Sequence, residues 1–141
     1  MEYHFRIHQE GPIYWAECLE LGDCLAQGHT ELDLLDNLHE ALNLHLEHPD
    51  STKTIFPMPR KQLAGKNIVK VSVNPRVAWV TLLRNTRLAR QWTQMEAAKA
   101  LHIKNVYTYQ KLESSKTANP GLDTIVKIKA VFPEIKLELL I

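Results

Sequence analysis

The 141-residue sequence lacks any run of about 18 apolar residues, the length that a membrane-spanning helix needs. Its first residues, MEYHFRIHQE, are charged and alternating, unlike a signal peptide, so we expect a cytoplasmic location. The two cysteines, Cys18 and Cys24, have neither metal-binding nor redox spacing and fit a reducing compartment. The sequence also has no phosphate loop, nucleophile elbow or nicotinamide fingerprint. These absences predict a protein that is not an enzyme and needs no cofactor.

The histidines and paired carboxylates are the remaining candidates for catalysis or metal binding. His39, His45 and His48 contain no pair spaced four residues apart, as two ligands on one helix would be. Pairs such as Glu17 with Glu20 have no base or metal partner in evidence. An exposed acidic surface explains these residues better, and we expect no metal site.

Charge is distributed unevenly along the chain, although the net charge is only +1. Residues 1–48 hold one basic and ten acidic residues, a net charge of −9. Residues 60–141 hold fifteen basic and five acidic residues, a net charge of +10. This asymmetry indicates two domains with different partners. The basic part suits a nucleic-acid backbone, and the acidic part suits a basic protein surface.

The N-terminal part alternates between strand and turn signals and then changes to helical spacing. We predict strands at Tyr3–His8, Ile13–Leu21, Cys24–Gly28 and Ile68–Val73, and a helix from the cap Thr30 to Glu47. Between the helix and the last strand, residues 49–66 contain three prolines and no periodicity. The apolar stripe expected for the helix consists of Leu34, Leu35, Leu38, Ala41, Leu42 and Leu46. Together these elements predict a compact α+β unit.

The stretch from Thr93 to Glu113 has the pattern of two short helices joined by a tight turn. Thr93 and Glu96 form a capping box, which marks the start of the first helix. His102 lies in the turn, where glycine would be easier, so an unusual backbone angle is expected there. The pattern predicts a helix-turn-helix, and a helical bundle with a solvated surface is the alternative.

Polar, aromatic and basic residues surround this stretch in a way that suits DNA. Side chains at the start of the second helix can reach base edges, and nearby cations can bind phosphates. The candidate DNA-binding residues are Arg84, Arg87, Thr93, Gln94, Lys99, Lys104, Asn105, Val106, Tyr107, Thr108 and Lys111.

Two further helices and a strand are expected around the helix-turn-helix. Asn74 with Pro75 starts a helix well, because proline needs no amide partner in the first turn. A helix over 122–132 should turn Leu122, Ile125 and Ile128 inward. The tail, Ile135–Leu139, alternates strictly, which predicts a terminal strand that pairs with the same strand of a second subunit.

Both halves resemble known families. The first, YHFRIHQEGPIYWAECLELGDCLAQGHTELDLLDNLHEALNLHLE, resembles the HicB-type antitoxins of type II toxin–antitoxin systems. The motifs LLRNTRLARQWTQMEAAKAL, YQKLE, KTANP and VFPEIKL resemble the Cro/C1-type helix-turn-helix that many of these antitoxins carry. The resemblance implies a partial ribonuclease-H-like domain over 1–73, without nuclease activity, and a DNA-binding and dimerisation domain over 74–141.

The resemblance also implies a function. Such antitoxins neutralise a HicA-type toxin, an mRNA-cleaving ribonuclease, and they bind operator DNA to repress their own operon. A toxin that grips RNA should be basic, so the acidic domain is expected to bind it. The candidate toxin-binding residues are Glu17, Glu20, Asp23, Asp33, Asp36 and Glu40.

The sequence departs from the Cro/C1 pattern in two respects. The stretch from His102 to Glu113 is one residue longer than usual, which shifts the register of the reading helix, and His102 replaces the usual turn glycine. A second hypothesis therefore stays open: a stand-alone transcriptional regulator whose N-terminal domain binds a small ligand or only dimerises. A small basic open reading frame beside the gene would favour the antitoxin.

Overall fold

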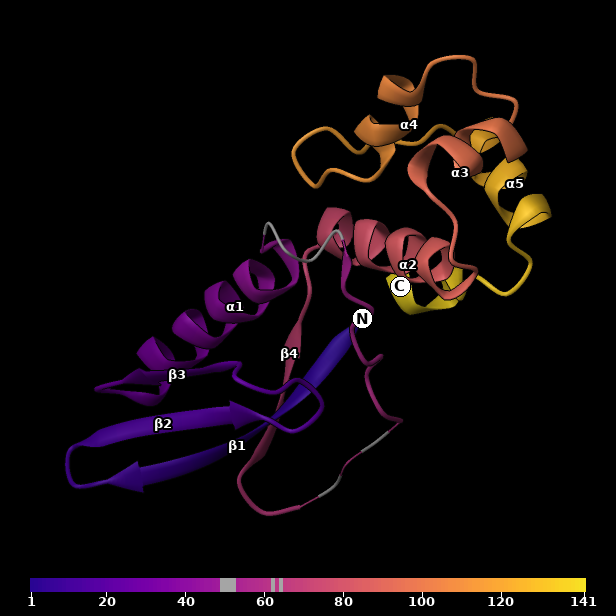
Figure 1. The fold of residues 1–141 in the computed structure, drawn as a ribbon. Coiled ribbons are helices and arrows are strands. Elements are labelled where there is room, and N and C mark those ends of the chain that lie inside the picture. Colours follow the sequence, from indigo (N-terminus) through magenta and orange to yellow (C-terminus); the bar gives the residue numbers. More distant parts are fainter. Residues whose placement is uncertain (49–52, 62, 64) are drawn as a thin grey trace. The chain divides into compact units, whose positions relative to one another are not determined.

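The computed structural model describes residues 1–48, 53–61, 63 and 65–141. The chain divides into two compact units (Figure 1). Of the described residues, 1–48, 56–61, 63 and 65–74 form the first, called here the sheet unit, and 53–55 and 75–141 form the second, called the helical unit. The α+β class predicted from the sequence is confirmed.

The sheet unit is built on four antiparallel strands: β1 (Glu2–Glu10), β2 (Ile13–Cys18), β3 (Leu25–Gly28) and β4 (Ile68–Ser72). Their order in the sheet is β3-β2-β1-β4. The first three strands form the predicted meander, and the fourth returns to the free edge of β1. The register pairs Phe5 with Cys18 and Val69, so these side chains share one face of the sheet.

Helix α1 (Glu31–Glu47) packs its apolar stripe against the sheet. Thr30 caps it, because the Thr30 hydroxyl oxygen accepts from the backbone N–H of Asp33 at 3.1 Å. The fully buried residues of this core are Tyr3, Phe5, Ala16, Leu34, Leu38, Leu42 and Leu46. Leu35, predicted to belong to the stripe, is 39% exposed, so that assignment is wrong.

Gly28 allows α1 to approach β3 closely. A Cβ atom built at this position would lie 2.6 Å from the backbone nitrogen of Leu34 and 2.9 Å from its Cα. Backbone atoms of a capped helix cannot move aside as a flexible side chain can, so the turn from β3 into α1 requires glycine.

The helical unit contains α2 (Pro75–Ala89), α3 (Gln94–Ala100), α4 (Val106–Leu112), α5 (Leu122–Val131) and the 3-10 helix η2 (Leu137–Leu140). The largest fully buried apolar side chains of its core are those of Leu83, Tyr109, Ile128, Phe132 and Ile135. Most predicted helices are therefore present, with ends within a residue or two of their expected positions.

Two predictions about the C-terminal part are wrong. The tail forms the 3-10 helix η2 and not a strand, with the N–H of Leu139 donating to the Lys136 carbonyl oxygen at 3.1 Å. Ile135 is 1% exposed, because it packs in the core of its own chain. The expected strand pairing between subunits through Ile135–Leu139 therefore has no basis. Leu122, predicted to face inward, is 83% exposed.

Candidate functional site

Helices α3 and α4 form a hairpin whose start is fixed by local hydrogen bonds. The Thr93 hydroxyl oxygen accepts from the N–H of Glu96 at 3.1 Å, and the Glu96 carboxylate accepts from the N–H of Thr93 at 3.3 Å. This is the predicted capping box, and it is confirmed. The side chain of Thr93 is thereby committed to holding α3.

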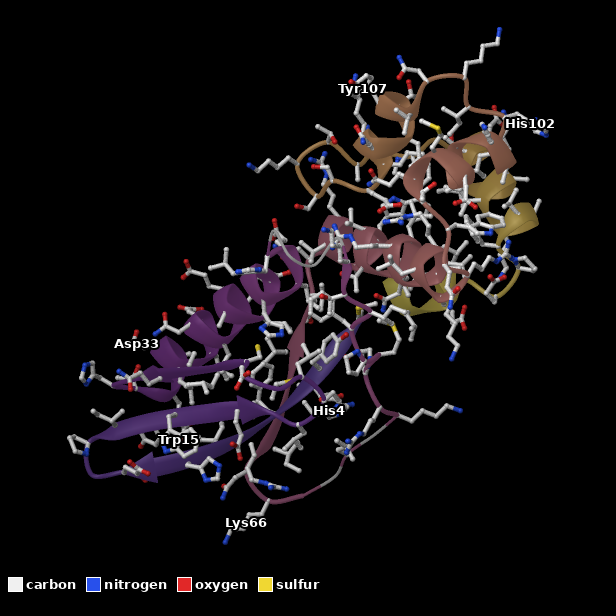
Figure 2. The ribbon with its side chains drawn as sticks, viewed as in Figure 1. His4, Trp15, Asp33, Lys66, His102 and Tyr107 are labelled. Carbon is white, nitrogen blue, oxygen red and sulfur yellow. The ribbon has the colours of Figure 1, made fainter. Side chains whose placement is uncertain are left out.

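The turn after α3 is a Schellman motif with His102 at the position where glycine is most common. The N–H of Ile103 donates to the Ala98 carbonyl at 2.9 Å, and the N–H of His102 donates to the Lys99 carbonyl at 3.0 Å. His102 has a φ of 57°, so the unusual backbone angle expected from the sequence is confirmed. Its side chain points away from the hairpin (Figure 2).

Replacing His102 by glycine is expected to raise the free energy of unfolding by about 1 kcal/mol. A residue with a Cβ atom is sterically strained in the left-handed backbone conformation, and glycine is not. His102→Ala is the matched control: it removes the same ring but keeps the Cβ atom, so it should change stability little. Urea unfolding monitored by tryptophan fluorescence measures both. Equal stabilities for the two variants would show that the backbone angle carries no such cost.

The start of α4 presents polar and aromatic side chains to solvent. Tyr107 is 69% exposed, and Thr108 is also exposed. Asn105 caps the helix, with its side-chain oxygen accepting from the N–H of Tyr107 at 2.8 Å. A two-bond contact from Asn105 to adenine would use that same oxygen, so the cap competes with it. Tyr107 and Thr108 are thus the freer candidates, and Val106 is half-buried.

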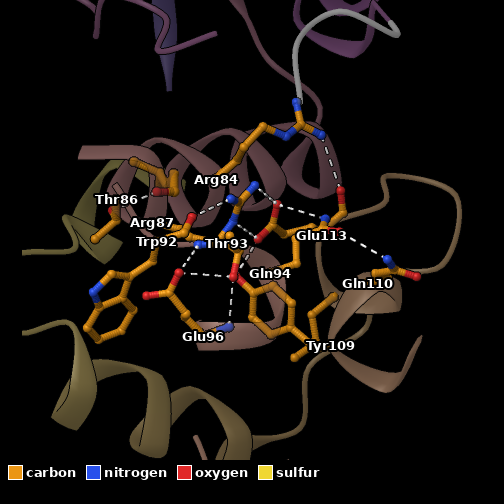
Figure 3. A network of polar contacts seen from close by, with 12 residues as sticks. Arg84, Thr86, Arg87, Trp92, Thr93, Gln94, Glu96, Tyr109, Gln110 and Glu113 are labelled. Carbon is orange, nitrogen blue, oxygen red and sulfur yellow. Dashed lines mark hydrogen bonds and ion pairs between the residues drawn. The ribbon is translucent and has the colours of Figure 1, made fainter. Parts of the chain in front are cut away.

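A buried polar network holds α4 against α2 (Figure 3). Glu113, at the end of α4, accepts from Arg87 Nε at 2.7 Å and from Arg87 Nη2 at 2.9 Å, a two-bond ion pair. Tyr109 donates its hydroxyl hydrogen to the same carboxylate. Arg84 adds a bond to the Glu113 carbonyl at 3.2 Å, and Gln94 a long one to the carboxylate at 3.5 Å. The network fixes the distance and the angle between α4 and α2.

Burial shapes the ionisation of this network. It raises the pKa of Tyr109 well above that of an ordinary phenol, and the charge of Glu113 raises it further. Burial also lowers the pKa of Arg87, but the hydrogen bond and charge of Glu113 outweigh burial and leave that pKa raised. The phenol of Tyr109 is therefore neutral and the guanidinium of Arg87 charged near neutral pH.

Two of the predicted phosphate-binding residues are part of this network and not of the surface. Arg84 is 6% exposed and Arg87 is 4% exposed. Their guanidinium groups bond to Glu113 and, for Arg87, to the Trp92 carbonyl oxygen at 2.8 Å. Assigning them to phosphates was wrong, because side chains spaced three apart can share an inward face as well as an outward one.

Lysines provide the exposed positive charge of the hairpin. Lys99, Lys104 and Lys111 are all exposed, whereas Gln94 is half-buried and accepts a hydrogen bond from Gln110 at 3.1 Å. A shallow depression of about 430 Å³ lies beside the turn between α3 and α4. It is lined by Met95, Ala98, Lys99, Ile103, Lys104, Asn105 and Val106.

Most of the predicted toxin-binding carboxylates are accessible in the sheet unit. Asp23, Asp33, Asp36 and Glu40 are exposed, and Glu17 is half-exposed, with His8 Nε2 at 3.2 Å from its carboxylate. Asp33 lies at the start of α1 (Figure 2).

Two apolar neighbours of these carboxylates were not predicted from the sequence. Leu32 is 76% exposed and Leu44 is 60% exposed. With Asp36 and Glu40 they form a row at every fourth residue along α1, which we call the α1 ridge. Counting this spacing on the polar face would have found them.

Glu20 differs from the other carboxylates, and its assignment to the toxin was wrong. Its side chain is 1% exposed and accepts from the backbone N–H of His4 at 2.9 Å and of Arg60 at 3.0 Å. The imidazole Nδ1 of His4 donates to it at 2.8 Å, because the other ring nitrogen accepts from the N–H of Leu63 at 3.4 Å. Glu20 and His4 therefore hold the backbone at Arg60 and Leu63 against the sheet.

Among the described residues, no group of three or more His, Cys, Asp or Glu side chains is placed to hold a metal ion. Burial raises the pKa of Cys18 to about 11 and of Cys24 to about 12, so neither thiol ionises near neutral pH. Within the same residues, no helix has both the length and the apolar character needed to cross a membrane.

Comparison with known proteins adds no relative: no protein-family model matches the chain, and no curated protein matches it either.

Proposed function

We propose that the protein is an antitoxin of the HicB kind that represses its own operon through the hairpin α3–α4 and captures a basic toxin through its acidic sheet unit. The observation that carries this proposal is the start of α4. Its exposed Tyr107 and Thr108 lie among exposed lysines. On the opposite, buried side, the ion pair between Arg87 and Glu113 holds α4 against α2.

DNA is the ligand that this arrangement fits best. A helix of the size of α4 enters the major groove, where side chains at its start meet base edges. The tyrosine and threonine hydroxyl groups offer donors and acceptors for such contacts. Lys99, Lys104 and Lys111 supply positive charge for the phosphates on either side. The hairpin then acts as a helix-turn-helix, with α4 as its reading helix.

The sheet unit fits a protein partner better than a nucleic acid. Helix α1 carries five acidic residues and no lysine or arginine. A phosphate backbone would be repelled by this helix, whereas a ribonuclease with a basic RNA-binding surface would be attracted. In this proposal the sheet unit is a partial ribonuclease-H-like fold used for binding alone.

Lys104→Ala should weaken binding to a duplex taken from upstream of the protein's own gene and reduce the slope of log affinity against log salt by about 1, because one phosphate contact is lost. Lys70→Ala is the control, since Lys70 is an exposed lysine on β4 of the sheet unit. Fluorescence anisotropy at several salt concentrations measures both slopes.

The outcomes separate the hypotheses. No binding of the parent protein to upstream duplexes would remove the repressor function. Equal slopes for the Lys104 variant and the parent would remove Lys104 from the phosphate contacts. Specific DNA binding without any toxin partner would favour the stand-alone regulator.

A further inference from the structure

Helix α5 exposes a row of apolar side chains that its own chain does not cover. Leu122 is 83% exposed and Val126 is 68% exposed. Ala130, a further four residues on, is exposed as well. Residues four apart lie along one ridge of a helix, so the three form a continuous apolar strip, called here the α5 strip. A single exposed leucine is common on protein surfaces, but a contiguous apolar strip that runs the length of the ten-residue helix α5 indicates an interaction surface.

Two opposite charges run along one flank of the α5 strip. Asp123 and Lys127 are both exposed, and neither takes part in a hydrogen bond or ion pair with the residues that the structure describes. On the other flank, Lys129 is already engaged, because its ammonium group donates to the carbonyl oxygens of Pro133 and Ile135, each at 2.8 Å. The free charges therefore all lie on one side of the strip.

We propose that the α5 strip binds the α5 strip of a second copy of this chain, with the two helices antiparallel. When the pairing is centred on Ile125, Asp123 of one copy stands at the same height as Lys127 of the other, since each lies two residues from the centre. A two-fold axis keeps both on the same flank, so the pair forms two equivalent ion pairs.

The register centred on Ile125 also lets the apolar side chains of the two strips interdigitate. An α-helix rises about 1.5 Å per residue, so strip residues four apart leave gaps of about 6 Å. In this register Leu122 of one copy falls between Val126 and Ala130 of the other, and Val126 falls between Leu122 and Val126. Ridges then fill grooves, as in ordinary helix packing.

A second copy suits this surface better than an unrelated partner because the surface is complementary to itself. Its acidic and basic groups are placed symmetrically about the centre, and a large leucine meets a small alanine. The contact is short, so the dimer should be weak in isolation and should gain strength where both copies are held together, for example by two neighbouring DNA half-sites.

Leu122→Glu should raise the dimer dissociation constant by about tenfold or more, because it places carboxylates in the apolar contact. Leu25→Glu is the matched control: Leu25 is 57% exposed on β3 of the sheet unit, and its replacement should leave self-association unchanged. Sedimentation equilibrium over a hundredfold range of chain concentration measures the dissociation constants, and far-ultraviolet circular dichroism checks that each variant is folded.

Charge exchange tests the antiparallel arrangement itself. Asp123→Lys alone and Lys127→Glu alone should each weaken the dimer several-fold, since each creates two like-charge pairs. The double variant D123K/K127E should restore the parent's dissociation constant, because it rebuilds both ion pairs with their signs reversed.

Three results would overturn the proposal: a parent chain that stays monomeric throughout, a dimer that Leu122→Glu leaves intact, or a double variant no better than the single ones. None of them depends on DNA or on a toxin, so a failure here is distinct from a failure of the proposed function.

Discussion

Glu113→Ala is expected to destabilise the helical unit by about 3–5 kcal/mol, the usual cost of leaving one buried partner of an ion pair without the other. The guanidinium of Arg87 would keep only its bond to the Trp92 carbonyl oxygen, in a site where its side chain is 5% exposed. Tyr109 would lose its acceptor as well. Because this network fixes α4 to α2, the proposed DNA binding should fall together with stability.

Arg90 and Glu134 provide the matched control. They form an ion pair of the same kind in the same unit, with Arg90 Nε 2.7 Å from the Glu134 carboxylate. Their side chains are 30% and 47% exposed, so solvent screens the pair. Glu134→Ala should therefore cost at most about 1 kcal/mol. Urea unfolding monitored by tryptophan fluorescence compares the two variants, and hydrogen exchange in α2 and α4 assigns the loss to the helical unit.

A double variant separates the ion pair from simple burial. Arg87→Met combined with Glu113→Ala removes both charges, so it should be less destabilised than the sum of the two single variants. Additive losses would show that the two side chains do not stabilise each other. A Glu113→Ala loss no larger than that of Glu134→Ala would show that the network does not hold α4 in place.

Reversing two charges on the α1 ridge should strongly slow capture of the toxin, if the proposed partner is basic. The variant D36K/E40K converts the middle of the ridge from negative to positive. We expect its association rate with the toxin to fall by about 10- to 1,000-fold, the range over which electrostatic steering acts. Co-expression with any small basic reading frame that lies beside the gene, scored by growth and by co-purification, gives the first measurement.

The choice of residues keeps the fold intact. Asp36 and Glu40 are exposed and form no ion pair among the described residues. Asp33 is left unchanged, because its negative charge suits the first turn of the helix. Glu20 is left unchanged because it is buried and holds the fold.

The control variant E2K/E10K changes the net charge by the same amount on β1, away from α1. Growth rescue by E2K/E10K but not by D36K/E40K would place the toxin on the α1 ridge. Equal losses for both would indicate that only the overall charge matters. Full rescue by D36K/E40K would remove the ridge from the toxin-binding surface.

Local features of the fold could be read from the sequence because the interacting residues lie within a turn of each other. The Thr93 box, the Thr30 cap and the left-handed backbone at His102 depend on bonds that span three to five residues. The first strands were recognisable for a similar reason, since alternation every second residue is itself the signal of a half-buried strand.

The candidate site could be predicted only in part. Exposure of Lys104, Tyr107 and Thr108 follows from their positions opposite the apolar residues of the hairpin. The burial of Arg84 and Arg87 could not be predicted, because their partner Glu113 lies 26 or more residues further along the chain. A basic residue looks the same in a sequence whether it meets solvent, a phosphate or a distant carboxylate.

The sequence by itself determined where the α-helices and the strands of the sheet begin, how charge divides between the two units, and which residues stand at the start of α4. Only the tertiary structure decided which charges are internal, that Glu20 binds His4 and not a partner, and that Leu122 faces outward. The alternating tail forms a 3-10 helix and not a strand. Ile135 is buried in the core of its own chain, so its burial needs no second chain. Patterns within a few residues are set by backbone geometry, whereas long-range pairs are set by which surfaces the folded chain brings together.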